Sequence, residues 1–407
     1  MAVVNKAMLQ ELNTEFNTEL LAIVNWWCDN SVDEDNGGFF GQIETDGTVV
    51  GSANKGIILN TRLLWFFSEA ALFTKDTQAA TLAKRSFHYL MDKFDDAEFG
   101  GFVWEVDCLG NLVDGKKQTY AQSFAIYALS AFYQLTGDEL ALEKAMETFS
   151  LLEEKTYEPM RGGYLEAFSR SWQEIHDMRL SEKDANLPKT MNTHLHVLEA
   201  YTNLFKVTKD EVVGAALKRL LDNFQSSIVD HSTYHLRLFM CRNWGDHSEA
   251  HSYGHDIEAS WLLHKSLVVL AHPKTTSKLT PTVLQLAETC LKEGIGTERQ
   301  VYDEIDIKTG HVNQASCWWV QAEAIVGFLT AYELTGDSSY IDAVAGIWSF
   351  IKKHHLDTDK GEWHWLSTLD QDDNYSEYKA GFWKGPYHNG RAMMESIKIL
   401  NRIYLGS

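Results

Sequence analysis

The chain has 407 residues, of which 44% are hydrophobic and 23% are charged, and only 5 are proline. This composition is typical of a folded protein and excludes a disordered or proline-rich chain. Lys and Arg number 36 against 57 Asp and Glu, so the formal net charge is −21. Nucleic acids and anionic membranes are therefore not expected as partners, because binding phosphate groups requires clustered cations.

The sequence shows neither a membrane-spanning pattern nor a leader. We find no apolar stretch of about 18 residues, so no membrane helix is expected, and residues 1–20 lack the apolar core of a signal peptide. The five cysteines are odd in number and form no CxxC pair. They predict free thiols in a reducing compartment and hence a cytoplasmic protein.

A Gly-aromatic turn recurs along the chain. It is clear at 37–40, 100–104 and 162–166, and weaker copies follow at 234–236, 301–303 and 361–365. Between these turns, a Thr-Lys/Gly-Asp connector recurs, in which the middle residue can end one helix and the Asp can cap the next. The connectors lie at 74–76, 136–138, 208–210 and 335–337. Six copies of one unit predict a solenoid or a closed toroid.

The segments between the turns have helical spacing. Some, such as 60–70, are apolar on all sides and should be buried, whereas their neighbours, such as 77–94, are amphipathic and should lie at the surface. In chain order we predict outer and inner helices alternating at 5–28, 55–74, 77–94, 118–136, 138–157, 189–208, 209–228, 252–271, 279–294, 316–336, 338–356 and 385–405. Six pairs without a linker predict an all-α fold, a single (α/α)6-barrel catalytic domain over 1–407, with hairpin loops at the active-site end.

In such a barrel all inner helices run in the same direction, so their first turns should converge on one pocket. The inner helices begin with polar and aromatic residues where a core would prefer leucine. These residues are Arg62, Tyr120, Asn192, His196, His255, Glu258, Trp318, Trp383 and His388. Pro386 suits the first position of the last helix, which places His388 in the first turn.

Side-chain chemistry makes this set a candidate catalytic site. His255 and Glu258 are three residues apart on one helix face, and a carboxylate beside an imidazole can fix its tautomer and raise its basicity. Arg62 is a fixed cation that can bind two oxygens at once. Three histidines at equivalent places in three repeats favour a functional role. Taken singly, each histidine, each tryptophan and Tyr120 could be a core residue, and Arg62 could be a structural ion-pair partner.

A metal site is an open alternative. His247, His251 and His255 are spaced by four and would share a helical face if the segment were helical, although Gly254 and Ser252 place the helix start near Ser252. No HExxH, no glycine-rich phosphate loop and no GxSxG motif is present. We therefore expect no metal and no cofactor.

Three segments resemble motifs of a known family. Residues 189–201, 252–261 and 383–391 are similar to the sixth-, eighth- and last-helix motifs of cellobiose 2-epimerases, within the N-acylglucosamine 2-epimerase superfamily. The similarity extends over essentially the whole chain. One departure is Gly385, which stands where a Cys is expected near His388.

The resemblance implies residue roles. His255 and His388 would be the two acid/base groups on opposite faces of C2, His196 would assist ring opening, and Glu258 would support His255. Sugar-binding residues would be Arg62, which also stabilises charge, together with Tyr120, Asn192, Asp184, Trp318, Trp383 and Glu304.

The chemistry of these groups fits that implication. An opened aldose has an acidic C2 proton, a neutral imidazole can remove it to leave a cis-enediolate, and a second imidazole can reprotonate the other face. The expected enzyme is a carbohydrate 2-epimerase of the isomerase class that inverts C2 of the reducing-end glucose of cellobiose or lactose to mannose. Its expected partner is a small sugar, and its expected state is a monomer or weak homodimer.

Other functions stay open. A D-mannose/D-glucose 2-epimerase or a mannose isomerase could use the same histidines on monosaccharides. A glycoside hydrolase on the same barrel would need two carboxylates about 5–10 Å apart, for which Asp184, Glu258 and Glu304 are candidates. A sugar-binding protein without activity would need only the aromatic residues. Trp172, Trp244 and Trp363 could form a second sugar subsite.

Overall fold

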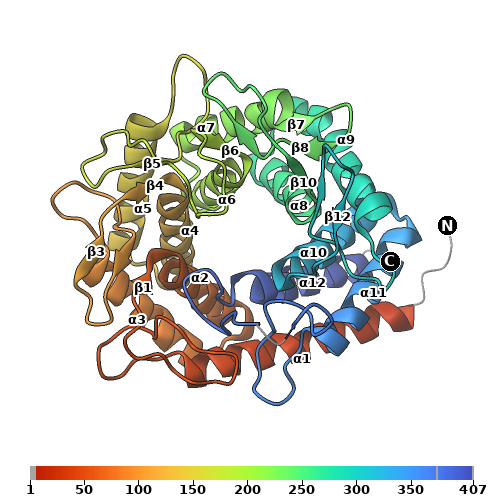
Figure 1. Ribbon diagram of the computed structural model, residues 1–407, viewed down its shortest axis with the longest axis horizontal. Coiled ribbons are helices and arrows are strands. Elements are labelled where there is room, and N and C mark those ends of the chain that lie inside the picture. The colour runs from red at the N-terminus through yellow and green to blue at the C-terminus, as the bar shows by residue number, and fades with distance from the viewer. Residues whose placement is uncertain (1–5, 373–374, 406–407) are drawn as a thin grey trace.

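The structure is a computed structural model that describes residues 6–372 and 375–405, in which twelve α-helices lie in two rings (Figure 1). The inner helices are α2 (Ile57–Thr74), α4 (Thr119–Thr136), α6 (Met191–Thr208), α8 (Tyr253–Leu270), α10 (Trp318–Thr335) and α12 (Tyr387–Leu405). The outer helices are α1 (Lys6–Asn30), α3 (Thr77–Lys93), α5 (Glu139–Leu151), α7 (Glu211–Asn223), α9 (Pro273–Thr289) and α11 (Ser338–His354).

The inner ring is closed. Each inner helix contacts the next one, and α12 returns to contact α2, while α1 packs against α12. This arrangement is consistent with the predicted six helix pairs of an (α/α)6 barrel.

The apolar inner helices are buried, as their sequences predict. By length and composition α2 could cross a membrane, so the expectation that no such apolar stretch exists is wrong. However, 78% of this helix is buried, and it packs against α3, α4 and α12. A helix that is apolar on all sides is explained here by burial between two protein layers.

The connectors between inner and outer helices have the predicted chemistry. Lys75 and Gly137 end their helices in the left-handed conformation, with φ of 63° and 70°. The side chains of Asp76 and Asp138 then accept hydrogen bonds from backbone N–H groups in the first turn of the next helix. The connectors at 208–210 and 335–337 repeat this pattern.

Helix boundaries differ from prediction at a few places. The helix predicted at 279–294 begins earlier, at Pro273, with His272 as its cap and Pro281 inside it. Three outer helices end in π-helical turns, namely η1 (Leu152–Thr156), η2 (Phe224–Ile228) and η3 (Cys290–Gly294). The last helix begins at Tyr387, one residue after Pro386, and His388 lies in its first turn as predicted. The predicted start of the first helix at residue 5 lies outside the described residues.

Short antiparallel strands form the hairpin loops that lead into the inner helices. The strands are β1 (Lys55–Gly56), β2 (Glu105–Val106), β3 (Leu112–Asp114), β4 (Lys117–Gln118), β5 (Ala167–Phe168), β6 (Lys189–Thr190), β7 (Val229–Asp230), β8 (His235–Leu236), β9 (Phe239–Met240), β10 (Ala250–Ser252), β11 (Glu304–Asp306) and β12 (Val312–Asn313). The sheets have the orders β1-β2-β3, β10-β11-β12, β4-β5, β6-β9 and β7-β8. Every pairing between these strands is antiparallel.

Buried ion pairs fix several of these hairpins. In each, a lysine just before or near an inner helix bonds a carboxylate at the start of a Gly-aromatic turn. The pairs are Lys55–Asp33, Lys117–Asp96, Lys189–Glu158 and Lys379–Asp357. Because a desolvated ion pair with additional hydrogen bonds permits few other arrangements, these pairs hold the loops above the inner helices in place.

Candidate active site

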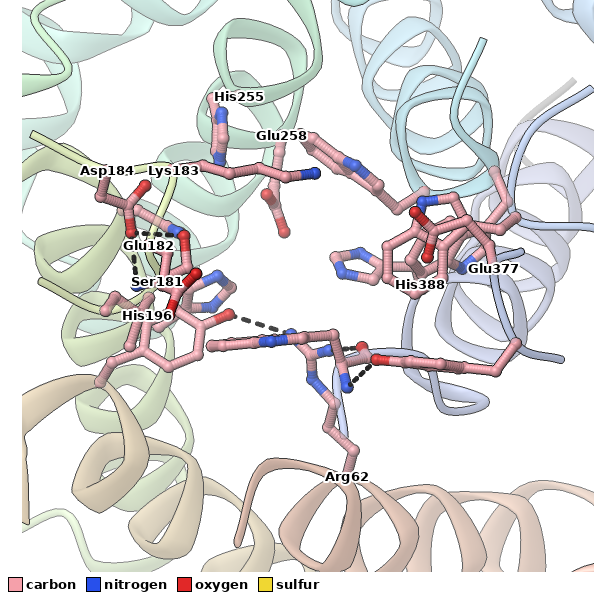
Figure 2. Close-up of a pocket in the computed structure, with 18 residues that line it drawn as sticks. Arg62, Ser181, Glu182, Lys183, Asp184, His196, His255, Glu258, Glu377 and His388 are labelled. Atoms are coloured by element: carbon pink, nitrogen blue, oxygen red, sulfur yellow. Dashed lines mark hydrogen bonds between the residues drawn. The ribbon is translucent and has the colours of Figure 1, made fainter. Parts of the chain in front are cut away.

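A pocket of about 500 Å³ opens at the N-terminal ends of the inner helices (Figure 2). Ten of the eleven predicted site residues line it, namely Arg62, Tyr120, Asp184, Asn192, His196, His255, Glu258, Trp318, Trp383 and His388. Glu304 is not among the lining residues. It lies on strand β11, where it pairs with Ser252 and Asn313, so its predicted contact with the same sugar is not supported by this geometry.

Arg62 lies on one side of the pocket without a carboxylate partner. Its Nη2 donates to the hydroxyl of Tyr120 at 2.9 Å and its Nη1 donates to the carbonyl of Trp383. Within residues 6–372 and 375–405, no carboxylate lies at ion-pair distance from its guanidinium. The alternative that Arg62 is a structural ion-pair partner is therefore wrong, and its charge is available for an oxyanion in the pocket.

Two of the pocket histidines are held by buried carboxylates. Nδ1 of His388 lies 2.7 Å from Glu323 Oε1, and Nδ1 of His196 lies 3.2 Å from Glu199 Oε2. A carboxylate accepts the Nδ1 proton, so Nε2 carries the lone pair. Burial lowers the pKa of both histidines. Both are therefore neutral at neutral pH, with a proton-accepting nitrogen left for the pocket.

His255 is held differently, and here the prediction is corrected. Its hydrogen-bond partner is the hydroxyl of Ser252, 2.8 Å from Nδ1, rather than Glu258. A hydroxyl can donate or accept, so either neutral tautomer of His255 is compatible with this contact. Burial lowers the pKa of His255 to about 3. His255 is therefore a neutral imidazole that can present either a proton or a lone pair.

The hydrogen-bond partner of Glu258 is an arginine rather than His255. Its Oε1 accepts a hydrogen bond of 2.6 Å from Arg391, which also bonds Glu323 at 2.7 Å. Burial and the nearby Glu323 raise the pKa of Glu258 to about 8, against the lowering effect of Arg391. Ligand atoms of Glu258, Glu323 and His388 lie within 4.8 Å of one another. Because the Arg391 guanidinium already bonds both carboxylates, a cation there would be repelled.

The structure contradicts the metal site that the spacing of His247, His251 and His255 suggested. Helix α8 begins at Tyr253, so His247 and His251 precede it and cannot share a helical face with His255. Instead, the imidazole of His251 stacks on that of His235, with 4.1 Å between ring centroids.

Several lining residues were not predicted. Some lie in the loop before α6. The others are tryptophans of the pocket wall or residues of the loop before α12. Together they are Leu180, Ser181, Glu182, Lys183, Trp319, Trp365, Glu377 and Tyr378. Trp319 lies between the catalytic candidates, with its ring centroid 4.8 Å from that of His255 and 5.6 Å from that of His388. The loop residues follow no periodic pattern, so sequence spacing carried no signal for them.

A second hollow of about 430 Å³ adjoins the pocket. The two share Trp383 and residues 180–182, and the second is lined in addition by Trp104, Lys116, Asp177, Arg179 and Phe382. Trp172, Trp244 and Trp363 line neither hollow. Their indole N–H groups bond Phe99, Arg161 and Glu19, so this geometry does not support the expectation that they form a second subsite beside the pocket.

The arrangement brings neutral imidazoles to several sides of one cavity, with a guanidinium below them in the view of Figure 2. His196 and His388 lie opposite one another in this view, and His255 lies above His196. Such a site can remove and return a proton on different faces of a bound carbon acid while the cation stabilises the anion formed.

Comparisons with known proteins identify the family of this chain. Residues 38–392 match the sequence profile of the N-acylglucosamine 2-epimerase (GlcNAc 2-epimerase) family. A cellobiose 2-epimerase from Bacteroides fragilis is 42% identical over 97% of this chain and 99% of its own length. A D-mannose isomerase from Marinomonas mediterranea is 25% identical over 89% of this chain and 92% of its own.

A solved structure extends the similarity to three dimensions. The cellobiose 2-epimerase from Bacillus thermoamylovorans superposes with a TM-score of 0.91 at 36% identity, covering 96% of this chain and 99% of that one. Sequence and overall structure thus agree, and the chain belongs to the N-acylglucosamine 2-epimerase family, as a carbohydrate epimerase of the isomerase class.

Proposed function

We propose that this enzyme inverts C2 of the reducing-end glucose of a β-1,4-disaccharide such as cellobiose or lactose, giving mannose at that position. The single observation that carries the proposal is the set of three neutral histidines around one pocket, two of them with Nε2 prepared as a proton acceptor.

The steps follow from what each side chain can do. His196 assists opening of the sugar ring, which exposes the C1 aldehyde and makes the C2 proton acidic. His388 or His255 removes that proton, and the charge of Arg62 stabilises the resulting cis-enediolate. After rotation about C2–C3, the other histidine protonates the opposite face. The first step needs a neutral imidazole, which gains the C2 proton. The second step needs an imidazolium, which returns a proton to C2, and exchange of both histidines with solvent restores their starting forms.

The adjoining hollow supports a disaccharide substrate. Trp383 borders both cavities, and Trp104 and Phe382 extend the aromatic wall, with Trp104 and Phe382 centroids 4.9 Å apart. Sugar rings bind readily on aromatic faces, so a second ring could lie there. The Bacteroides fragilis relative named cellobiose 2-epimerase points the same way.

Proton NMR in D2O tests the reaction. The enzyme is incubated with cellobiose and, separately, with mannose. We expect deuterium at C2 of the reducing sugar, a new epimer and an intact glycosidic bond. Release of glucose would identify a hydrolase, and an unchanged spectrum would identify a binding protein; either result contradicts the proposal.

The second candidate function is epimerisation or aldose–ketose isomerisation of free mannose. It is favoured by the similarity to the Marinomonas mediterranea D-mannose isomerase. Substitution Trp104→Ala separates the two. If the second hollow binds a second ring, this variant raises the KM for cellobiose while leaving kinetics with mannose unchanged. Equal effects on both sugars favour the monosaccharide function.

We also propose that the chain acts as one catalytic domain, as a monomer or weak homodimer, in the cytoplasm. All five cysteines are unpaired, as predicted, which suits a reducing compartment.

A further inference from the structure

Below the pocket, one arginine connects the groups that hold the histidines. Arg391 lies on α12, three residues after His388, and its side chain is fully buried. Nη1 bonds Glu199 and the hydroxyl of Tyr387, and Nη2 bonds Glu258 at 2.6 Å and Glu323 at 2.7 Å. Arg391 thus joins four inner helices, α6, α8, α10 and α12, through one planar group.

The guanidinium is also fixed by aromatic rings. Its carbon lies 4.7 Å from the centroid of Trp261 and 4.1 Å from that of Tyr387. Trp261 in turn donates its indole N–H to Glu323 Oε2 at 2.9 Å. A planar fork with five donors, stacked on rings, allows little rotation. Arg391 is therefore a rigid anchor for the carboxylates that it bonds.

Two of these carboxylates are the ones that bond pocket histidines. Glu199 accepts from both Arg391 and His196, and Oε1 of Glu323 accepts from both Arg391 and His388. One guanidinium therefore bonds three carboxyl groups, and two of the three, Glu199 and Glu323, lie directly between it and an imidazole. Without the arginine, each of those carboxylates would favour the protonated imidazolium.

We propose that Arg391 is a positioning residue for the reaction: it orients His196 and His388 through Glu199 and Glu323, and its charge keeps both imidazoles in the neutral, proton-accepting form. This inference rests on the proposed function. Arg391 does not line the pocket, so it acts through the carboxylates rather than on the sugar.

Other charged and titratable groups lie around these histidines and also influence their pKa values. They come from every inner helix around the pocket and are Arg62 on α2, Tyr120 on α4, Glu199 on α6, His255 and Glu258 on α8, Glu323 on α10, and Tyr387 on α12. Of these, Arg62 is the remaining cation on the inner helices, and the loops before α6 and α12 add Glu182, Lys183, Asp184 and Glu377 to the pocket lining. Loss of Arg391 would therefore leave Glu199 and Glu323 bonded to the histidines without the cation that now bonds both carboxyl groups.

The test uses the full chain labelled with ¹⁵N-histidine, because imidazole nitrogen shifts report tautomer and charge directly. In the wild type we expect His196 and His388 to be neutral at neutral pH, with the proton on Nδ1 and with pKa values below the ordinary imidazole value. In Arg391→Met the pKa of both should rise, by about one unit or more. The kcat/KM for cellobiose should then fall at low pH, where the wild type is unaffected.

Arg391→Lys separates charge from geometry and serves if Arg391→Met does not fold. Lysine keeps the charge but cannot bond three carboxylates as a fork. Both histidines should stay neutral, while kcat falls about tenfold with little change in KM. The matched control is Arg402→Met, an exposed arginine on the same helix that bonds Glu333, which should leave both readouts unchanged.

Two results would overturn the inference. One is a folded Arg391→Met whose His196 and His388 titrate as they do in the wild type; the other is an Arg391→Lys enzyme with wild-type kcat. Absence of turnover by the wild type would contradict the proposed function instead. The histidine titrations would still decide the role of Arg391, because they require no substrate.

Discussion

His194 and His196 lie two residues apart on α6, both fully buried, yet they face different neighbours. Both ring nitrogens of His194 are bonded to backbone: Nδ1 donates to the Thr190 carbonyl at 2.6 Å, and Nε2 accepts from the Tyr164 N–H at 3.0 Å. His196 bonds Glu199 through Nδ1 only, and the residue lines the pocket.

Under the proposed function, this difference in hydrogen bonding separates a structural histidine, His194, from one that takes part in the reaction, His196. An imidazole with both nitrogens used holds two segments together, here the hairpin before Tyr164 and the first turn of α6. An imidazole with one nitrogen bonded by a carboxylate keeps the other for a proton transfer. Burial does not separate the two roles, since it lowers the pKa of His194 to about 4 and lowers that of His196 as well.

The largest expected effect tests the chemical side of this comparison. His388→Ala and His255→Ala should each lower the rate of C2 proton exchange by about 10³-fold or more, since each removes a group that transfers a proton. His194→Gln, the control on the structural side, should keep kcat within about threefold in the folded enzyme. Full exchange by either alanine variant would remove the acid/base assignment.

The second-largest expected effect is the dependence of the free energy of unfolding on pH that His194 causes. The pKa of His194 is about 4 in the folded chain and about 6.5 when unfolded. As pH falls from 6.5 to 4, the unfolded chain binds a proton that the folded chain does not. This histidine therefore contributes stability above pH 6.5 that is lost as pH falls, by about 3 kcal/mol.

Denaturant unfolding of wild type and His194→Gln at several pH values measures this contribution. The difference in free energy of unfolding between the two should shrink as pH falls from about 6.5 to 4. A difference that does not depend on pH would show that His194 titrates as it does in the unfolded chain.

The smallest expected effect concerns the Ser252 hydroxyl, which forms a hydrogen bond with His255. Ser252 caps α8 and also bonds the imidazole. Ser252→Ala should lower the free energy of unfolding by about 1 kcal/mol through loss of the cap, and should lower kcat severalfold by freeing the ring. Ser252→Thr keeps the hydroxyl and should retain both values. If threonine behaved like alanine, the hydroxyl would not be the cause.

Much of the fold could be predicted from the sequence because it repeats. The Asp caps at Asp76 and Asp138, with Lys75 and Gly137 before them, have a local mechanism and were confirmed. The start of α9 was placed too late because residues 273–282 are rich in Thr, Ser and Pro, which are typical of loops. Burial of the face that carries Leu279 outweighs that local preference.

The sequence predicted the site residues that lie at the starts of the inner helices. It did not predict the residues that lie one helical turn deeper. Glu199, Glu323 and Arg391 lie a turn below the pocket, beyond the first helical turns on which the prediction of the site depends. A signal existed, since charged residues inside apolar helices must have partners. The pairing of Glu258 with Arg391 rather than His255 could not be read from spacing, because it joins residues 133 positions apart on different helices.

The closed inner ring has a consequence for synthesis on the ribosome. The first helix, α1, packs against the last, α12, and α12 also fills the gap between α10 and α2. A nascent chain must therefore keep the faces of α1 and α2 that pack against α12 uncovered until α12 emerges. The same helix delivers His388 and Arg391, so catalytic competence should arise in a single late event rather than grow with chain length.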